Sequence, residues 1–293
     1  MKTKKPNLKK IKPRTAALVL GSGGARGWAH IGVLKALDEA GFVPGICIGT
    51  SIGSVAAAVH GAGVLAETLE LAEKFDFVQA SKIFVEPSFR KSGFIRGRKM
   101  VEFLEKLIPV REISDLSSRY AAVATNLETG EETVFSDGSL TDAIRASVSI
   151  PGLFTPAKIN GGHFVDGGLV NPLPISVARA MGADFVIAVN INNKMPALAA
   201  QTANSSHAEI AQSAVEKIAA KIFNVSTNPA KMSLFEVFSH SFRIAEDRMT
   251  RDCIRANPPD ILIEPLVGDI ATLDFTRATE AIEAGYQAAI KYL

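Results

Sequence analysis

The first part of the chain alternates short apolar runs with stretches in which apolar residues recur at helical spacing. Residues 16–20 form a continuous apolar run, which predicts a strand buried on both faces. Residues 28–40 place Ile31, Leu34 and Leu37 on one side of a predicted helix. Strands that alternate with helices are typical of a mainly parallel sheet with helices on both faces, so we predict an α/β fold.

The same unit of strand, tight turn and helix recurs at once. We predict a strand at 46–48, a turn at 49–53 and an alanine-rich helix at 54–60 that packs closely against the sheet. The carboxyl ends of parallel neighbouring strands lie at the same edge of a sheet. We therefore expect the turns at 21–27 and 49–53 to lie at one edge.

Similar elements are predicted along the rest of the chain. Further strands are expected at 120–125, 133–135, 157–159, 163–165, 185–189 and 261–263. Further helices are expected at 139–146, 175–181, 208–223 and 234–254, and from 277 onward. No internal repeat and no linker divides the sequence. We expect a basic flexible tail over residues 1–15 and one domain over 16–293.

Charge is nearly balanced overall but uneven along the chain. The formal net charge is +2, which is too small to indicate a nucleic-acid-binding protein, and 47% hydrophobic residues are ample for a buried core. Seven of the first fourteen residues are basic, whereas the first acidic residue is Asp38. Such a tail is either solvated or in peripheral contact with an anionic membrane surface, and the sequence leaves both readings open.

Two further patterns bear on location and cofactors. No apolar run reaches the ~20 residues that a membrane-spanning helix requires, and the apolar run at 16–20 is too short for a secretion signal. The spacing of Cys47 and Cys253 indicates neither a disulfide framework nor a metal site. We expect a cytoplasmic protein, in contact at most with the inner membrane surface, that uses no metal and no cofactor. Its oligomeric state is not predicted.

The turn at 49–53 carries the first candidate for catalysis. Its sequence, Gly49-Thr50-Ser51-Ile52-Gly53, fits the G-x-S-x-G nucleophile elbow, in which glycines allow a strained turn that exposes the serine hydroxyl. The turn lies between a predicted strand and a predicted helix, which is the setting that such an elbow requires. Ser51 is therefore the candidate nucleophile, and an ordinary tight turn is the alternative interpretation.

The glycine-rich turn at 21–27 directs several backbone N–H groups toward one point, where they favour negative charge. A phosphate-binding P-loop would end in Gly-Lys-Ser/Thr, and this loop ends in Arg26-Gly27-Trp28. A dinucleotide-binding fold would place an acid where Ser51 stands. The loop instead suits stabilisation of an oxyanion formed on Ser51. Arg26 either adds charge to that hole or pairs with a structural carboxylate.

A base for Ser51 is expected from Asp166, which follows the predicted hairpin strand at 163–165. The hairpin turn is Asn160-Gly161-Gly162, a strong signal for two antiparallel strands. Gly167 and Gly168 permit another loop to approach the aspartate closely, although Asp-Gly-Gly is also a common turn sequence.

The segments 23–27, 49–53 and 166–168, in this order, resemble the signature of the patatin-like phospholipases, above all the small bacterial members. Residues 146–154 also resemble the family, and the resemblance covers about 16–190. It implies a three-layer α/β/α sandwich and hydrolysis of lipid carboxylic esters. It further implies a dyad of Ser51 and Asp166 and an oxyanion hole that is formed by Gly23, Gly24, Ala25 and Arg26. Ser22 stands where the family pattern has its first glycine.

Several alternatives stay open at this point. One is a Ser–Asp–His triad in which His207 or His240 serves as base, although neither lies in a recognisable loop motif. Another is a regulatory adaptor with a hydrolase fold, against which the combined motifs argue. Residues 84–100 mix aromatic with basic side chains, which suits anionic lipid headgroups and equally suits a surface loop. The headgroup and the chain length of the substrate are not predicted, nor is the role of 191–293.

Overall fold

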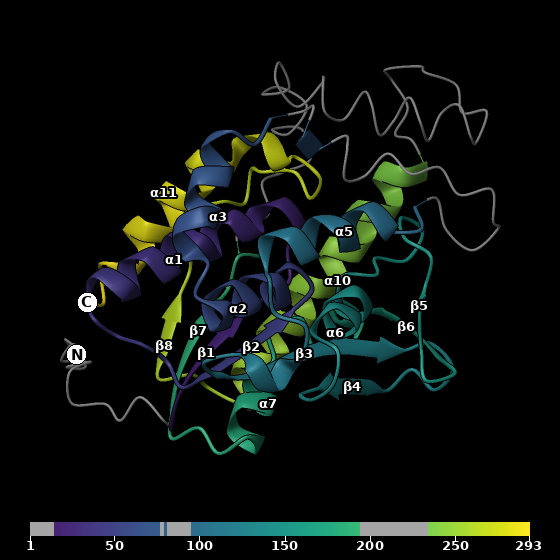
Figure 1. Cartoon of the computed structure of the whole chain (residues 1–293), viewed down its shortest axis with the longest axis horizontal. Helices are drawn as coiled ribbons and strands as arrows, with labels where there is room; N and C mark the ends of the chain where they lie inside the picture. The colour runs from purple at the N-terminus through teal and green to yellow at the C-terminus, as the bar shows by residue number, and fades with distance from the viewer. Residues whose placement is uncertain (1–14, 77–78, 81–94, 194–233) are drawn as a thin grey trace.

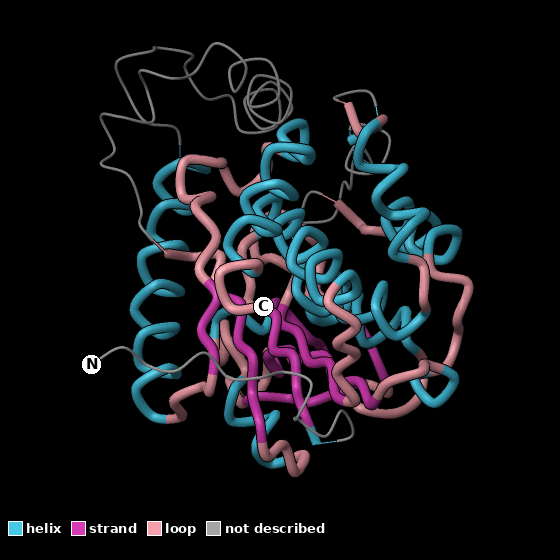
Figure 2. Tube along the Cα trace, turned by 90° about the vertical axis from the view of Figure 1, so that its left-hand side faces the viewer, coloured by secondary structure: helices cyan, strands magenta, loops and turns pink. Residues whose placement is uncertain are grey.

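The computed structural model describes residues 15–76, 79–80, 95–193 and 234–293, and in this part a central sheet separates two layers of helices (Figures 1 and 2). The sheet has eight strands in the order β5-β6-β3-β2-β1-β7-β8, with β4 paired to β3 outside this path. The pairs among β3, β2, β1, β7 and β8 are parallel, whereas the pairs of β3 with β4 and β6, and of β5 with β6, are antiparallel. The predicted α/β/α architecture with a mainly parallel sheet is confirmed.

The elements follow the predicted order along the chain. The strands are β1 (Ala16–Leu20), β2 (Ile46–Thr50), β3 (Arg119–Asn126), β4 (Glu132–Phe135), β5 (Ala157–Ile159), β6 (Gly162–Asp166), β7 (Phe185–Val189) and β8 (Ile261–Ile263). The α-helices are α1 (Trp28–Glu39), α2 (Ile52–Ala62), α3 (Leu65–Glu73), α5 (Arg98–Leu107), α6 (Leu140–Ser147), α7 (Ile175–Ala180), α10 (Leu234–Ala256) and α11 (Ala278–Ala289). Short 3-10 helices include η3 (Gly24–Gly27) and η5 (Gly167–Leu169).

Alternation along β1 divides the core between the two faces of the sheet. Leu18 and Leu20 join the larger cluster, which includes residues of α1, α2, α6 and α11. Ala17 and Val19 join the second cluster, which includes residues of α7 and has α10 at its border. Because successive side chains of a strand point to opposite faces, a continuous apolar run is what a strand between two helical layers requires.

The strand register brings the predicted motifs to one edge of the sheet. Leu20 of β1 is the parallel partner of Gly49 in β2, so both glycine-containing turns begin at this edge, as predicted. Thr50 pairs with Val123 of β3, and the neighbouring Ala124 pairs with Asp166 of antiparallel β6. The end of β6 therefore lies beside the end of β2.

Two helices and several residue positions differ from the sequence prediction. Helix α3 was not predicted, and α5 occupies the end of the segment 84–100 and extends beyond it. Helix α2 begins at Ile52, two residues before the predicted start, and Ser139 caps α6 by accepting a hydrogen bond from the N–H of Asp142, as expected. The predicted tail (except Thr15), residues 84–94, the helix at 208–223 and His207 lie outside the described residues.

Within the described ranges, no helix combines the length and the hydrophobicity that crossing a membrane requires.

The contact between α1 and α11 depends on two glycines that let the helix backbones approach each other. A Cβ atom on Gly285 would lie 1.9 Å from the carbonyl oxygen of Ala29, and one on Gly32 would lie 1.9 Å from that of Ile282. Each clash is with backbone, so relief requires that the two helices separate.

We expect Gly285→Ala to lower the free energy of unfolding by about 3 kcal/mol, because overpacking at this crossing outweighs the gain in helix propensity. Urea denaturation followed by circular dichroism measures the change. Gly61→Ala is the matched control, since its new Cβ would lie 3.2 Å or more from the side chains of Leu116 and Ser118. Equal stability of Gly285→Ala and wild type would contradict this account of the helix crossing.

Candidate active site

Ser51 occupies a strained turn between β2 and α2. Its φ and ψ angles are 56° and −126°, a conformation that costs on the order of 1–3 kcal/mol for a residue with a side chain. The flanking glycines have no room for a Cβ atom: at Gly49 it would lie 2.1 Å from Gly53 backbone, and at Gly53 2.1 Å from the Leu20 carbonyl oxygen. The geometry is that of the nucleophile elbow predicted from the sequence.

The hydroxyl of Ser51 donates a hydrogen bond of 2.6 Å to Oδ2 of Asp166. The other carboxylate oxygen of Asp166, Oδ1, accepts a hydrogen bond of 2.8 Å from the N–H of Gly168. Both side chains are buried. The structure thus brings the two predicted residues into direct contact, with no histidine between them.

Ser147, at the end of α6, holds the backbone of the nucleophile elbow through hydrogen bonds. The N–H of Ser51 donates to Oγ of Ser147 at 2.8 Å, and that hydroxyl donates to the carbonyl of Val123 at 2.6 Å. Ser147 falls within the stretch 146–154 that resembles the family, but the sequence predicted no role for it. Ser51 and Ser147 are 96 positions apart in the chain, so no local sequence pattern reveals their contact.

The glycine loop after β1 lies beside Ser51, and its backbone donors differ in availability. The N–H of Ala25 donates to the carbonyl of Thr272 at 2.8 Å, and the N–H of Ser22 donates to that of Pro172. Among the described residues, none accepts a hydrogen bond from the N–H of Gly23 or Gly24. Gly24 lines both cavities at Ser51. Of the residues predicted to form the oxyanion hole, Gly23 and Gly24 therefore have N–H groups available for a ligand, whereas that of Ala25 is occupied.

Arg26 is fully buried, with its guanidinium turned into the loop. Its Nε donates to the carbonyl of Gly23 at 2.9 Å, and its two terminal nitrogens have no hydrogen-bond partner in the described part of the chain. Burial and, to a smaller extent, the charge of Arg243 lower the pKa of Arg26 to about 9, although Glu246 opposes the shift. Arg26 therefore braces the glycine loop, and Glu246 is the carboxylate that favours its charge.

Helix α10 contributes two charged residues that the sequence did not identify. Arg243 and Glu246 are each 5% exposed, and Glu246 Oε1 accepts a hydrogen bond of 2.7 Å from the hydroxyl of Ser22. The pair is three residues apart on a helix that otherwise carries many exposed charges, so its sequence gave no distinct signal. Only the packing of α10 against the glycine loop reveals the two residues.

Burial raises the pKa of Asp166 to about 7, and the hydrogen bonds from Ser51 and from the N–H of Gly168 oppose this shift. A carboxylate with a pKa close to neutral is a stronger base than an ordinary aspartate and is still substantially ionised near neutral pH. The site therefore combines a hydroxyl donor with a carboxylate that is suited to accept its proton.

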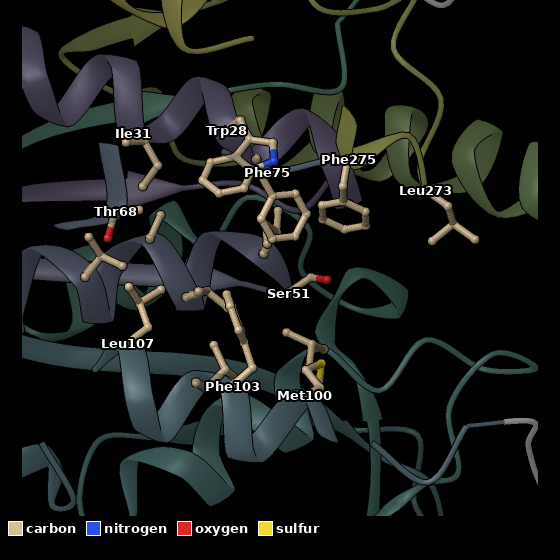
Figure 3. Close-up of a pocket in the computed structure, with 18 of the residues that line it drawn as sticks. Trp28, Ile31, Ser51, Thr68, Phe75, Met100, Phe103, Leu107, Leu273 and Phe275 are labelled. Carbon is tan, nitrogen blue, oxygen red and sulfur yellow. The ribbon is translucent and has the colours of Figure 1, made fainter. Parts of the chain in front are cut away.

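Ser51 lines two cavities. The larger has a volume of about 130 Å³ and is lined almost entirely by apolar side chains. It extends from Ser51 past Phe75 and Phe103 toward Ile31, Thr68 and Leu107 (Figure 3). The smaller, of about 30 Å³, is lined by both apolar and polar side chains: Asp166, Phe238, Ser239, Phe242, Arg243 and Glu246.

The described residues contain no group of three or more histidine, cysteine, aspartate or glutamate side chains that could hold a metal ion. His30 is buried against the carbonyl of Gly21, at 2.8 Å from its Nε2, and burial lowers its pKa to about 4. His30 is therefore neutral and structural at neutral pH.

The sequence of this chain is similar to those of known proteins. A family model described as patatin-like phospholipase matches residues 18–179. An uncharacterized NTE family protein of Mycobacterium tuberculosis is 32% identical to this chain. The alignment covers 93% of this chain and 89% of that protein. Human patatin-like phospholipase domain-containing protein 6 is 35% identical over 61% of this chain, and lysophospholipase NTE1 of Pyricularia oryzae is 26% identical over 96%. The matched parts are 14% and 18% of these last two proteins.

The raised pKa of Asp166 predicts a cost in stability that depends on pH. The folded protein favours the neutral acid, so ionisation reduces stability as pH rises from about 4, the ordinary value, to about 7. We expect Asp166→Asn to be more stable than wild type at pH 8, by on the order of a few kcal/mol, and the difference to vanish near pH 4. Thermal unfolding across this pH range measures it, and the exposed Asp137→Asn is the control. A difference that stays constant with pH would contradict the prediction.

Proposed function

The chain belongs to the patatin-like phospholipase family, and on that premise we propose that it hydrolyses a carboxylic ester of a lipid, with Ser51 as nucleophile and Asp166 as base. The observation that carries the proposal is the 2.6 Å hydrogen bond from Ser51 Oγ to Asp166 Oδ2, on a strained elbow that faces an apolar cavity. The family name and the lysophospholipase among the relatives support a lipid substrate.

In the first half of the proposed reaction, Asp166 accepts the proton of Ser51 as Oγ attacks the ester carbonyl carbon. The carbonyl oxygen becomes an oxyanion, which the N–H groups of Gly23 and Gly24 stabilise. Ala25 and Arg26 complete the hole by holding the loop through Thr272 and the Gly23 carbonyl. The carbon–oxygen bond then breaks, Asp166 returns its proton to the leaving alcohol, and the acyl group stays on Ser51.

In the second half, Asp166 accepts a proton from water, whose oxygen attacks the acyl carbon. The second oxyanion collapses, the bond to Ser51 Oγ breaks, and the proton on Asp166 returns to that oxygen. The fatty acid leaves and the dyad is restored. A histidine base is not needed, because the serine hydroxyl already bonds directly to the carboxylate.

The two cavities support an assignment of the two halves of the substrate. The larger cavity is lined almost entirely by apolar side chains and takes the acyl chain. The smaller cavity has polar groups beside Ser51 and Asp166 and takes the alcohol side of the ester. Because α10 lines the second cavity and α11 packs on α1, we also propose that residues 16–293 form one hydrolase domain.

One prediction from the proposed function concerns the dyad. We expect a fluorophosphonate probe to label wild type and not Ser51→Ala, and we expect Asp166→Asn to lose at least about a thousandfold in turnover. His240→Ala and His207→Ala should each stay within about tenfold of wild type, a change of ~1.4 kcal/mol in the barrier. Turnover of a soluble ester measures all four variants, with circular dichroism as the control for folding. A folded histidine variant as inactive as Asp166→Asn would replace the dyad with a Ser–Asp–His triad.

A further prediction concerns the acyl cavity. Leu107→Trp fills the end of the cavity away from Ser51 (Figure 3), so hydrolysis of long-chain esters should fall about tenfold while short-chain esters are cleaved at the wild-type rate. Rates across a series of chain lengths measure this change in preference. Leu127→Trp is the matched control, because Leu127 is 53% exposed and outside the cavity. An unchanged chain-length preference in Leu107→Trp would show that the acyl group binds elsewhere.

A further inference from the structure

One end of helix α10 exposes apolar side chains to solvent. Val237, Phe238 and Ile244 are between 40% and 55% exposed. Over residues 237–245, Arg243 is the one aspartate, glutamate, lysine or arginine residue, and its side chain is buried. The next stretch, 247–255, carries five such residues, of which four are exposed. The exposed surface of the helix therefore changes along its axis from apolar to charged.

The apolar end of α10 lies at the mouth of the smaller cavity. Phe238 lines that cavity and is also exposed, so its ring lies where the cavity meets solvent. The ring stacks on that of Phe242, with 6.3 Å between the two centroids. A Cβ atom on Gly152 would lie 3.8 Å from the ring of Phe238, so the loop before β5 packs against the helix here. Ser51 lines the same cavity, and the apolar end of α10 therefore borders the way to the nucleophile.

Val237 and Ile244 lie beside this mouth on the outer face of α10. They are seven residues apart, which is about two turns, so their side chains project from the same face. Neither residue lines the smaller or the larger cavity at Ser51. Their exposure thus belongs to the surface around the site, and a substitution at either position leaves the walls of both cavities intact.

The exposed apolar area of these three residues is too small for a stable interface with another protein chain. A large apolar side chain contributes at most ~250 Å², so three that are about half exposed offer less than ~400 Å². A stable protein interface buries ~800 Å² on each partner. The surface of a lipid aggregate sets no such threshold, because each apolar side chain that enters it adds its own transfer free energy.

The proposed substrate points to the same partner. An ester with a long acyl chain is held in a lipid aggregate and has to leave it to reach Ser51. Ile150 and Leu153 line both cavities, so apolar side chains continue from the mouth at Phe238 toward the acyl cavity. A mouth with an apolar rim that rests in the lipid surface lets the acyl chain enter without exposure to water.

We propose that the apolar end of α10, formed by Val237, Phe238 and Ile244, docks the protein on the surface of the lipid aggregate that holds its substrate. The inference rests on the proposed function for the choice of partner and adds the surface that meets it. Docking is apolar, so it does not require the basic residues among 1–14 of the sequence.

Sedimentation with phosphatidylcholine vesicles measures docking, in Ser51→Ala protein so that no lipid is hydrolysed. Adding Val237→Ser and Ile244→Ser should weaken binding about tenfold, at low and at high salt alike, because apolar contacts are not screened by ions. Val43→Ser is the matched control. Val43 is 54% exposed and precedes β2, at the edge of the sheet opposite the elbow, so its replacement should leave binding unchanged.

The same substitutions in the protein that retains Ser51 separate docking from catalysis. Turnover of a soluble short-chain ester by the Val237→Ser/Ile244→Ser double variant should stay within about twofold of wild type, as expected for surface substitutions. Hydrolysis of a long-chain ester carried in the same vesicles should fall about tenfold. Circular dichroism is the control for folding.

Three results would overturn docking by α10: no vesicle binding by Ser51→Ala protein, binding that high salt abolishes, or binding that the folded double variant retains in full. A dimer in light scattering that the double variant dissociates would assign the surface to a second copy of the chain and overturn it as well. If vesicle binding falls as expected but wild type cleaves no ester, the proposed function fails and the docking surface stands.

Discussion

The site depends on one hydrogen bond, from Ser51 Oγ to Asp166 Oδ2, between residues 115 positions apart in the chain. Three features of the fold set its length. Ser51 is held in a positive-φ turn by glycines that have no room for side chains, and Ser147 fixes its N–H. The register of β3 with β6 places Asp166 opposite Ala124, beside the end of β2. A displacement of the Ser51 turn or of the end of β6 by about 1 Å would separate the Ser51 hydroxyl from the Asp166 carboxylate.

The same bond explains why the Asp166 carboxylate is buried, although burial of its charge lowers the free energy of unfolding. Asp166 is 1% exposed, and water that would stabilise its charge is replaced by a serine hydroxyl and one backbone N–H. The charge is thereby less stable than in solution, which makes Asp166 a better base. The strain at Ser51 is a second cost of this kind. Both are typical of a site in which stability is lost in exchange for reactivity.

Local patterns predicted most of the described sheet and placed the glycine loop and the turn of Ser51 at one edge, because strand and turn signals lie in short stretches of sequence. The position of Asp166 beside them follows from the antiparallel register of β3 with β6, which the sequence did not predict. Helix α3 was missed, as was α5, which buries only Met100 and Leu104 and whose first residues belong to the segment 84–100 that was interpreted either as a lipid-binding segment or as a surface loop. Ser147, Arg243 and Glu246 could not be predicted, since their contacts join distant segments. The sequence also could not distinguish Ala25, whose N–H is bound by Thr272, from Gly23 and Gly24.

The central claim is that an acyl group is transferred to Ser51 before water releases it, and the most direct measurement is peptide mapping of enzyme quenched with acid during turnover. With an activated ester as substrate, mass spectrometry should find the acyl mass on the peptide that contains Ser51, at the serine itself. The rise of this adduct should match the release of the first equivalent of alcohol. An acyl group on another residue, or turnover by a folded Ser51→Ala protein, would contradict the account.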